Sequence, residues 1–553
     1  MKKTFLALLV GAALVLAFSV PGQAQDVGKY LGKADFNIRG DYWIAGGSND
    51  NIFDFDDQTH DARRYLYQRF RWWIDTSIEG KYGGTFGFEH DWIWGSNVTQ
   101  TGTASNTAVG DVARGDDLNN TKLKHAYIWF LIPGTPVKVT AGLQGFGGLE
   151  PNNIMYARDD YFGVRLDAPI IKNVLNVSGW WIKLTEGEGS ILTGATASPV
   201  NLFDAFPSNK YHGDRDDADL YLINVSGALT KWFRFGQYNQ WVHVAEGGQH
   251  WLDFASNSSR QLGGRWGARM IAGDYLWHGL WIAIEPTIGS LPVYFRAHGN
   301  FFWGSTRENN DDVPGSPAAT PVFLVTKSGL FPVPVVVSPY GDVVDPRAWA
   351  VLAHAGIKPG PFDIGVRFAW FQGADDITLG ATGGEIPTIT MQTNGARWNG
   401  WSSVDAFHGQ FELFESGYRS WSQGWSTYTG APRGHAYLAL DATWQTTKQL
   451  SLNLLAGYIW ATNWKDKPFA ALFKPDGDWN KSKELGWEVD LTATYKIYPN
   501  LTLDLIGAYF FAGKGLDHVG LSGAPGAGGA AWSNLPGGGD DAWELFWRLR
   551  YVF

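Results

Sequence analysis

The chain has 553 residues and a formal net charge of -10, with 29 Trp, 69 Gly and no cysteine. The acidic balance argues against a nucleic-acid partner, and the lack of cysteine excludes disulfides and thiolate metal sites. Beyond the N-terminus no apolar run approaches the ~18 residues that a spanning helix needs, so the 15% of aromatic residues must serve another architecture.

The N-terminus has the pattern of a secretory signal peptide. A basic head, Met1-Lys2-Lys3, precedes the apolar stretch from Thr4 to Val20, and small residues follow up to Ala24. We therefore expect residues 1–24 to be removed, which takes the formal charge to -12, and residues 25–553 to form a single domain.

Further along, apolar residues repeatedly occupy every second position. Successive strand side chains point to opposite faces, so this period predicts strands with one lipid-facing side. It recurs at Phe36 to Ile44, Phe70 to Ile78, Phe86 to Trp94, Val137 to Leu143, Val293 to Phe301, Phe362 to Trp370, Ala436 to Trp444, Leu452 to Trp460, Trp487 to Tyr495 and Leu501 to Phe511. Weaker strands are predicted near 121–132, 174–186, 218–227 and 275–288.

The connections alternate between short and long. The short ones centre on Gly83-Gly84, Gly134-Thr135, Ile171-Lys172, Thr230-Lys231, Leu291-Pro292, Pro359-Gly360, Lys448-Gln449 and Pro499-Asn500. The long ones include 308–344 and 377–432, and we expect one or both of these two to fold inward or cap the mouth. The fold class is therefore all-β, a transmembrane antiparallel up-and-down barrel of about 18 strands, with 16 as an alternative. Short periplasmic turns and long extracellular loops would join the strands.

The last strand, Trp543 to Phe553, alternates most clearly. Its even-numbered residues are charged or polar except Phe546 and Val552, which are apolar exceptions on the predicted lumenal face. We expect this strand to pair with the first and close the barrel. Its terminal Phe553 resembles the signal that the barrel assembly machinery recognises.

The opposite register predicts the pore wall, which is heavily charged. The predicted pore-lining and selectivity residues are Arg39, Arg69, Arg71, Arg165, Arg234, Arg296, Arg367, Arg548, Arg550, Asp75, Glu89, Asp91, Asp490 and Glu544.

Barrel closure should gather five of these arginines into an arginine ladder of Arg39, Arg69, Arg71, Arg548 and Arg550. Closely spaced guanidiniums would favour carboxylates or phosphates, which makes the ladder a candidate anion-selectivity element. Alternatively, the arginines form a structural network that neutralises a crowded lumen. The carboxylates predicted for that network are Asp41, Asp75, Asp490 and Glu544.

The whole mature chain resembles the large bacterial outer-membrane porins, and its expected strand count and its size are most similar to the alginate-export family of 18-stranded barrels. The likeness lies in the strand Val137 to Gln144, which ends in Gly-Leu-Gln, followed by Asp160-Tyr161-Phe162-Gly163-Val164-Arg165-Leu166. Leu143 stands where the family's pattern has Arg between Gly and Gln. The resemblance implies passage of an anionic polysaccharide through an arginine-rich pore.

The function predicted from these features is a porin of the cell outer membrane of a Gram-negative-type bacterium. It would pass small hydrophilic or anionic solutes by diffusion and contact lipid and lipopolysaccharide, and a homotrimer is one assembly open to it. The alternatives are a specific channel for acidic saccharides, a barrel sheath for a partner protein, or an outer-membrane enzyme. An enzyme is not predicted, because His298 beside Asn300 and His435 near Asp441 lack a serine elbow or zinc motif. No cofactor or metal is predicted.

Overall fold

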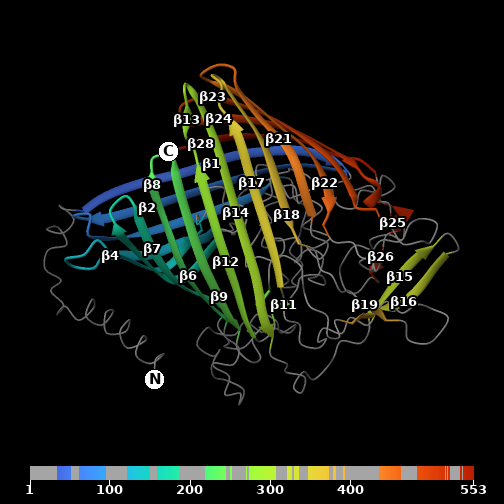
Figure 1. Ribbon diagram of the computed structural model, residues 1–553, viewed down its shortest axis with the longest axis horizontal. Coiled ribbons are helices and arrows are strands. Elements are labelled where there is room, and N and C mark those ends of the chain that lie inside the picture. Colours follow the sequence, from blue (N-terminus) through green and yellow to red (C-terminus); the bar gives the residue numbers. More distant parts are fainter. Residues whose placement is uncertain are drawn as a thin grey trace, which may run out of the picture.

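The computed structural model describes residues 34–50, 62–94, 121–147, 149, 159–185, 218–244, 250–251, 269–270, 273–306, 320–326, 329–335, 347–372, 378–380, 390–392, 435–462, 482–516, 518–519, 521–523, 536–537 and 540–553. The predicted signal peptide at residues 1–24 lies outside these residues, as do most of the long connections. The described part is almost entirely strand (Figure 1).

The barrel strands from the first half of the chain are β1 (Ala34–Asp50), β2 (Arg63–Ile78), β3 (Tyr82–Ile93), β4 (Thr121–Leu131), β5 (Lys138–Phe146), β6 (Asp159–Ile171), β7 (Leu175–Thr185), β8 (Ala218–Thr230), β9 (Phe233–Val244) and β12 (Gly273–Ile284). Those from the second half are β14 (Leu291–Thr306), β17 (Arg347–Ile357), β18 (Phe362–Phe371), β21 (His435–Gln445), β22 (Leu450–Ala461), β23 (Glu484–Tyr498), β24 (Leu501–Ala512) and β28 (Ala542–Val552). A two-residue piece, β13 (Thr287–Ile288), extends the pairing of β14 at the turn after β12.

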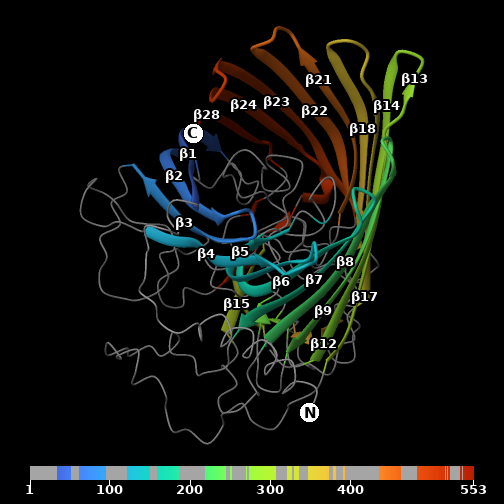
Figure 2. The same cartoon turned by 90° about the vertical axis from the view of Figure 1, so that its left-hand side faces the viewer.

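Each barrel strand pairs antiparallel with its neighbours in the chain, and β1 also pairs with β28. The described strands therefore form a closed 18-strand up-and-down barrel, as the sequence predicts, and the alternative of 16 is wrong. Figure 2 follows the ring from β28 through β21, β14 and β6 back to β1. All four of the weaker predicted strands are present, as β4, β7, β8 and β12.

The described parts of the long connections hold short strands. A hairpin of β15 (Thr320–Thr326) and β16 (Gly329–Val335) pairs with β26 (Leu521–Gly523), so segments of the connections 308–344 and 514–540 lie together. The others are β10 (His250–Trp251), β11 (Arg269–Met270), β19 (Thr378–Gly380), β20 (Thr390–Gln392), β25 (His518–Val519) and β27 (Pro536–Gly537). Whether 308–344 or 377–432 folds inward depends on residues outside the described part.

No helix among the described residues is both long and apolar enough to cross a membrane.

The short connections all lie at one end of the barrel, here called the short-turn end. Positive φ angles bend several of them, at Gly80, Gly134, Asn173, Gly289 and Gly360. Two predicted turn centres are wrong by a few residues. Gly83-Gly84 lies inside β3, where a Cβ on Gly83 would come within 2.0 Å of the Thr76 carbonyl oxygen, and Leu291-Pro292 begins β14.

The outer face of the barrel is largely apolar, and the buried polar side chains lie on the lumenal face. Large apolar side chains such as Phe162, Leu280 and Leu545 are at least 60% exposed on the outer face. Buried polar side chains such as Gln240, Glu488 and Glu544 lie on the lumenal face, at no more than 1% exposure. A soluble protein has the opposite arrangement, so the outer face is built for lipid and the barrel spans a membrane.

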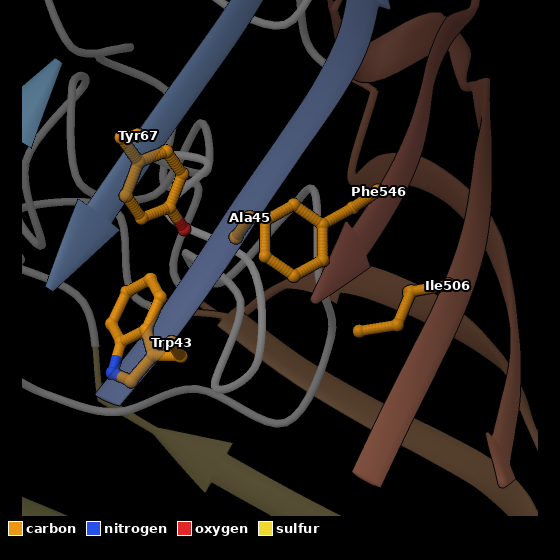
Figure 3. Close-up of a cluster of buried hydrophobic side chains, with 5 residues drawn as sticks. All are labelled: Trp43, Ala45, Tyr67, Ile506 and Phe546. Carbon is orange, nitrogen blue, oxygen red and sulfur yellow. The ribbon is translucent and has the colours of Figure 1, made fainter. Parts of the chain in front are cut away.

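The seam between the two chain ends is closed on both faces. On the lumenal face Trp43, Ala45, Tyr67, Ile506 and Phe546 form a buried cluster from four strands, β1, β2, β24 and β28 (Figure 3). The Trp43 and Tyr67 rings meet edge to face with centroids 5.1 Å apart. The apolar exception Phe546 is therefore a lumenal core residue.

On the outer face of the seam, Phe553 exchanges two backbone hydrogen bonds with Gly40, of 2.8 and 3.0 Å. A Cβ on Gly40 would come within 2.1 Å of the Phe553 ring, so the glycine makes room for the terminal aromatic residue. The same ring stacks on Phe70 of β2, with centroids 6.3 Å apart. The C-terminal residue thus helps to close the barrel.

Candidate functional site: the lumenal wall

The lumenal wall has two parts that differ by depth. Toward the long-loop end its side chains are buried and largely apolar, with a few buried polar residues such as Glu488 and Glu544 among them, and we call this part the dry half. Ile182, Leu220, Val242 and Tyr275 show the pattern, because they lie opposite one another on four neighbouring strands and are at most 2% exposed. Further members are Leu222, Trp277, Phe302, Ala369, Tyr437, Ile459 and Phe510.

Toward the short-turn end the wall carries ion pairs, and we call this part the charged half. Its pairs are Arg39–Asp75, Arg550–Asp41, Arg548–Asp504, Arg165–Asp167, Arg234–Glu285, Arg296–Glu285, Lys358–Asp363 and Arg367–Asp441. These pairs come from strands all around the barrel, and several of their cations are 40% or more exposed. The charged half is therefore in contact with water, unlike the dry half above it.

Two arginines of the ladder, Arg39 and Arg550, lie where β28, β1 and β2 adjoin. Arg550 binds Asp41 with two hydrogen bonds of 2.8 and 2.9 Å, and Arg39 donates to Asp75 over 2.7 Å. Both carboxylates were predicted to be partners in a structural network. The Arg39 guanidinium also lies 4.5 Å from the centre of the Trp73 ring, a cation–π contact.

The third arginine of the seam, Arg548, has its partner on the neighbouring strand β24. Arg548 lies directly opposite Asp504 of β24 and donates to it from Nε and Nη2, over 3.1 and 2.8 Å. Thr494 of β23 also donates to Asp504, over 2.8 Å. The predicted partner Glu544 lies nearer the long-loop end and accepts hydrogen bonds from Tyr65 and Asn49, while Asp490 is buried on β23.

The remaining two ladder residues belong to a cluster centred on Glu89 of β3. Arg71 donates to this carboxylate, Arg69 lies 3.8 Å away and Lys124 of β4 lies 3.5 Å away. Lys124 also approaches Asp160 to 2.5 Å. We call Arg69, Arg71, Glu89 and Lys124 the Glu89 cluster. The side chain of Asp91, which faces Arg69 in the register, lies outside the described part.

Lys124 is not among the predicted lumenal residues, because a bulge interrupts the alternation of β4. The β3–β4 register shifts between Gly87 and Phe88, so Lys124 is an extra residue between Leu123 and His125. His125 accepts a hydrogen bond from the Trp73 indole over 3.0 Å at Nδ1, and its Nε2 lies 2.8 Å from Asp160. The sequence signal for this bulge is the pair of adjacent polar residues, Lys124 and His125, ahead of the alternating part of β4.

On the opposite wall, Glu285 in the turn after β12 bridges two arginines. Arg296 donates to one carboxylate oxygen over 2.7 Å, and Arg234 donates to the other over 2.8 Å. Burial acts to raise the pKa of Glu285, but the hydrogen bonds and charges of Arg296 and Arg234 outweigh it and hold this pKa below its ordinary value. The predicted residue Arg165 is paired with Asp167, which also accepts a hydrogen bond from Ser178 over 2.7 Å.

The predicted residue Arg367 lies in a larger network. It donates to Asp441 from two nitrogens, and Asp441 also accepts from Asn453 over 3.0 Å and lies 3.4 Å from His354. The Tyr294 hydroxyl lies 3.2 Å from His354 and donates to Asp363 over 2.9 Å. Sequence reasoning did not select His354 or Tyr294.

Aromatic side chains with polar tips link three strands at a time across the lumenal wall. Tyr238 of β9 lies over Gly279 of β12, where a Cβ would come within 2.1 Å of its ring, and its hydroxyl reaches His298 and Asn300 of β14. Tyr65, Trp73 and Tyr294 use Gly47, Gly87 and Gly356 in the same way to reach Glu544, His125 and Asp363. Glycine lets the rings lie flat against the wall.

No family model matches this chain, and no curated protein matches it. Among solved structures it is similar to OccAB1 of Acinetobacter baumannii, with 9% identity, a TM-score of 0.47 and coverage of 94% of this chain and 97% of that one. It is also similar to the outer membrane protein opdK of Pseudomonas aeruginosa, with 10% identity, a TM-score of 0.46 and coverage of 94% and 99%. The strand register, closed by the pairing of β1 with β28, defines the barrel independently of these similarities. An 18-strand closed barrel with an apolar exterior is the architecture of a large outer-membrane porin.

Proposed function

We propose that the chain is a channel of the bacterial outer membrane through which hydrophilic solutes diffuse passively. The observation that carries this proposal is the charged half of the lumenal wall, in which water-exposed ion pairs surround the interior of a membrane-spanning barrel. The short-turn end then faces the periplasm and the long connections face outward. The predicted pore-lining residues of the charged half would interact with passing solutes through their charges and hydrogen-bonding groups.

The pairing pattern supports weak rather than strong ion selectivity. Each of the predicted arginines, including all five of the ladder, lies within 4 Å of a carboxylate in the described structure. A paired guanidinium attracts a passing anion less than a bare one, because the carboxylate offsets its charge. The geometry therefore favours the structural network over the selectivity ladder for most of the wall.

The first experiment is the reversal potential of the purified protein in planar bilayers across a potassium chloride gradient. We expect open channels with little preference between the ions. Arg39→Gln should shift the preference toward cations and Asp75→Asn toward anions, since each leaves the other charge of one exposed pair. A protein that inserts but conducts no ions would contradict a diffusion channel.

A second candidate is a channel selective for acidic saccharides, which is also what the resemblance to alginate exporters implies. The Glu89 cluster favours it, because three cations surround one carboxylate there. Galacturonic acid oligomers should then block the current at lower concentration than neutral maltose oligomers of equal length. Lys124→Gln should abolish that difference, and equal block by both sugars in the parent would rule this candidate out.

The other sequence-based alternatives gain less support. Buried His298 bonds to the Tyr238 hydroxyl, which also accepts from Asn300, and this arrangement contains no activated nucleophile. Asp441 is engaged by Arg367, and the side chain of His435 lies outside the described part. A sheath for a partner protein needs a wide interior, which the buried side chains of the dry half do not favour.

The C-terminal strand is also part of the proposal. We infer that the barrel assembly machinery recognises the strand ending in Phe553 during insertion. Before closure, that strand would be unpaired along its β1 side, because its register with Asp41 to Asp50 forms only when the barrel closes. Phe553 would then move onto Gly40 as the last step.

A further inference from the structure

The lumenal face of β4 carries a pair of aromatic residues, Tyr127 and Trp129. Ile128 and Phe130, which alternate with them along the strand, are 49% and 37% exposed on the outer face, so the pair points into the lumen. β4 lies between β3 and β5 (Figure 2). The residues opposite the pair on these two strands are small, namely Gly83, Thr85, Thr140 and Gly142. Both aromatic side chains are partly exposed.

The polar tips of this pair differ from those of other lumenal aromatic residues. Trp73 donates its indole N–H to His125, and Tyr294 donates its hydroxyl to a carboxylate. Within the described residues, the Tyr127 hydroxyl and the Trp129 indole nitrogen make no hydrogen bond. The pair therefore offers the lumen both aromatic surface and two unused hydrogen-bonding groups.

Charged side chains border the pair toward the short-turn end. The Lys138 ammonium lies 4.7 Å from the centre of the Trp129 ring, and no carboxylate of the described residues lies within 4 Å of it. Asp167 of β6 lies opposite Lys138 in the register, is 31% exposed, and is paired with Arg165 over 2.8 Å. The border thus supplies both a donor and an acceptor in the charged half, where water reaches the wall.

A sugar ring matches this combination of groups. The faces of a glucopyranose ring carry axial C–H bonds, which pack on an aromatic ring, and its rim carries hydroxyls that both donate and accept hydrogen bonds. Tyrosine and tryptophan supply large apolar contact together with a polar tip. A linear polyether of the same mass lacks the flat C–H face, and a small inorganic ion lacks the hydroxyls as well.

We propose that Tyr127 and Trp129 form a stacking site for the sugar rings of a neutral oligosaccharide inside the barrel, with Lys138 and Asp167 binding hydroxyls. Lys138 moves off the Trp129 ring when the sugar binds, which its flexible stem allows. The site rests on the channel proposed above and names a class of solute that it binds on the way through.

Block of the ionic current in planar bilayers tests the site. Maltohexaose should reduce the current through the parent at concentrations at which polyethylene glycol of equal mass does not. Tyr127→Ala/Trp129→Ala should need at least tenfold more maltohexaose for half block. The lipid-facing Phe130→Ala, on the same strand, is the matched control and should behave as the parent. Equal block of the parent by the two solutes, or unchanged sugar block in the double variant, would overturn the proposal.

A second variant keeps the rings, and a second measurement needs no open channel. Tyr127→Phe/Trp129→Phe retains stacking surface but removes both polar tips. We expect titration calorimetry in detergent to show roughly two- to fivefold weaker binding of maltohexaose than in the parent. Unchanged binding in this variant, or no binding by the parent, would overturn the proposal. Sugar binding without ion conduction would contradict the channel alone, whereas conduction without sugar binding would contradict this site alone.

Discussion

The dry half and the charged half of the lumenal wall are built on the same strands with the same alternation, yet their side chains are in different environments. Phe302 in the dry half is fully buried, whereas the Arg39 and Arg234 side chains in the charged half are 45% and 44% exposed. Alternation therefore determines which face a residue occupies, and depth determines whether water reaches it. Stability should depend on the dry half and ion flow on the charged half.

The largest expected effect that would test this division is the loss of packing in the dry half. Phe302→Ala removes a fully buried ring that stacks on Trp277 with centroids 4.6 Å apart. We expect a loss of about 3 to 5 kcal/mol in the free energy of unfolding, as for other buried aromatic residues. Urea unfolding in lipid vesicles measures it. The outward Phe301→Ala is the matched control, and an equal loss in both would contradict close packing in the dry half.

Glu89 lies where the two halves meet, so its loss should affect both properties. Glu89→Gln leaves Arg69, Arg71 and Lys124 without their shared carboxylate in a mostly buried position. We expect roughly 2 to 3 kcal/mol of destabilisation, below the full cost of breaking a buried pair, because the cations retain some solvent contact. The reversal potential should shift toward anions in the same variant. A change in only one of the two properties would place Glu89 fully within one half.

A smaller loss of stability is expected at the middle of the wall, where an aromatic ring lies over a glycine. Gly279→Ala places a Cβ within 2.1 Å of the Tyr238 ring, so the ring must move away from His298 and Asn300. We expect a loss of about 1 to 3 kcal/mol from this overpacking. Gly299→Ala, on the outer face with open space around it, is the control and should cost less. Chemical denaturation of both variants makes the comparison.

The sequence predicts the strands and their faces well, because lipid on one side allows few polar residues there. It predicts side-chain pairing less well. The connection from β24 to β28 is long, so no tight turn fixes their register, and the partner of Arg548 proved to be Asp504. Lys124 enters the Glu89 cluster through a bulge of one residue, which a period of two does not reveal.

In the sequence, the division of the wall by depth was visible only as apolar exceptions at predicted lumenal positions. Phe546 broke the polar pattern of the last strand, and its burial with Trp43 and Tyr67 explains why. Alternation alone could not distinguish such a residue from a misplaced strand boundary, because both put an apolar side chain on the lumenal face. The structure distinguishes these two explanations, because it shows that Phe546 is buried within a continuous strand.

The smallest expected effect concerns the pH dependence of one exposed site in the charged half. The pKa of Glu285 lies below its ordinary value of 4.5, because Arg296 and Arg234 favour the ionised carboxylate more than burial opposes it. Its contribution to stability is therefore complete above pH 4.5 and is lost as the pH falls through the lowered pKa.

The parent should lose more thermal stability between pH 6 and about pH 3 than Glu285→Gln does. Glu79→Gln, in an exposed turn at the same end, is the control. Because both groups contact solvent, the difference should be small compared with the effect of Phe302→Ala, and a larger one would mean that the charged half also supports the fold.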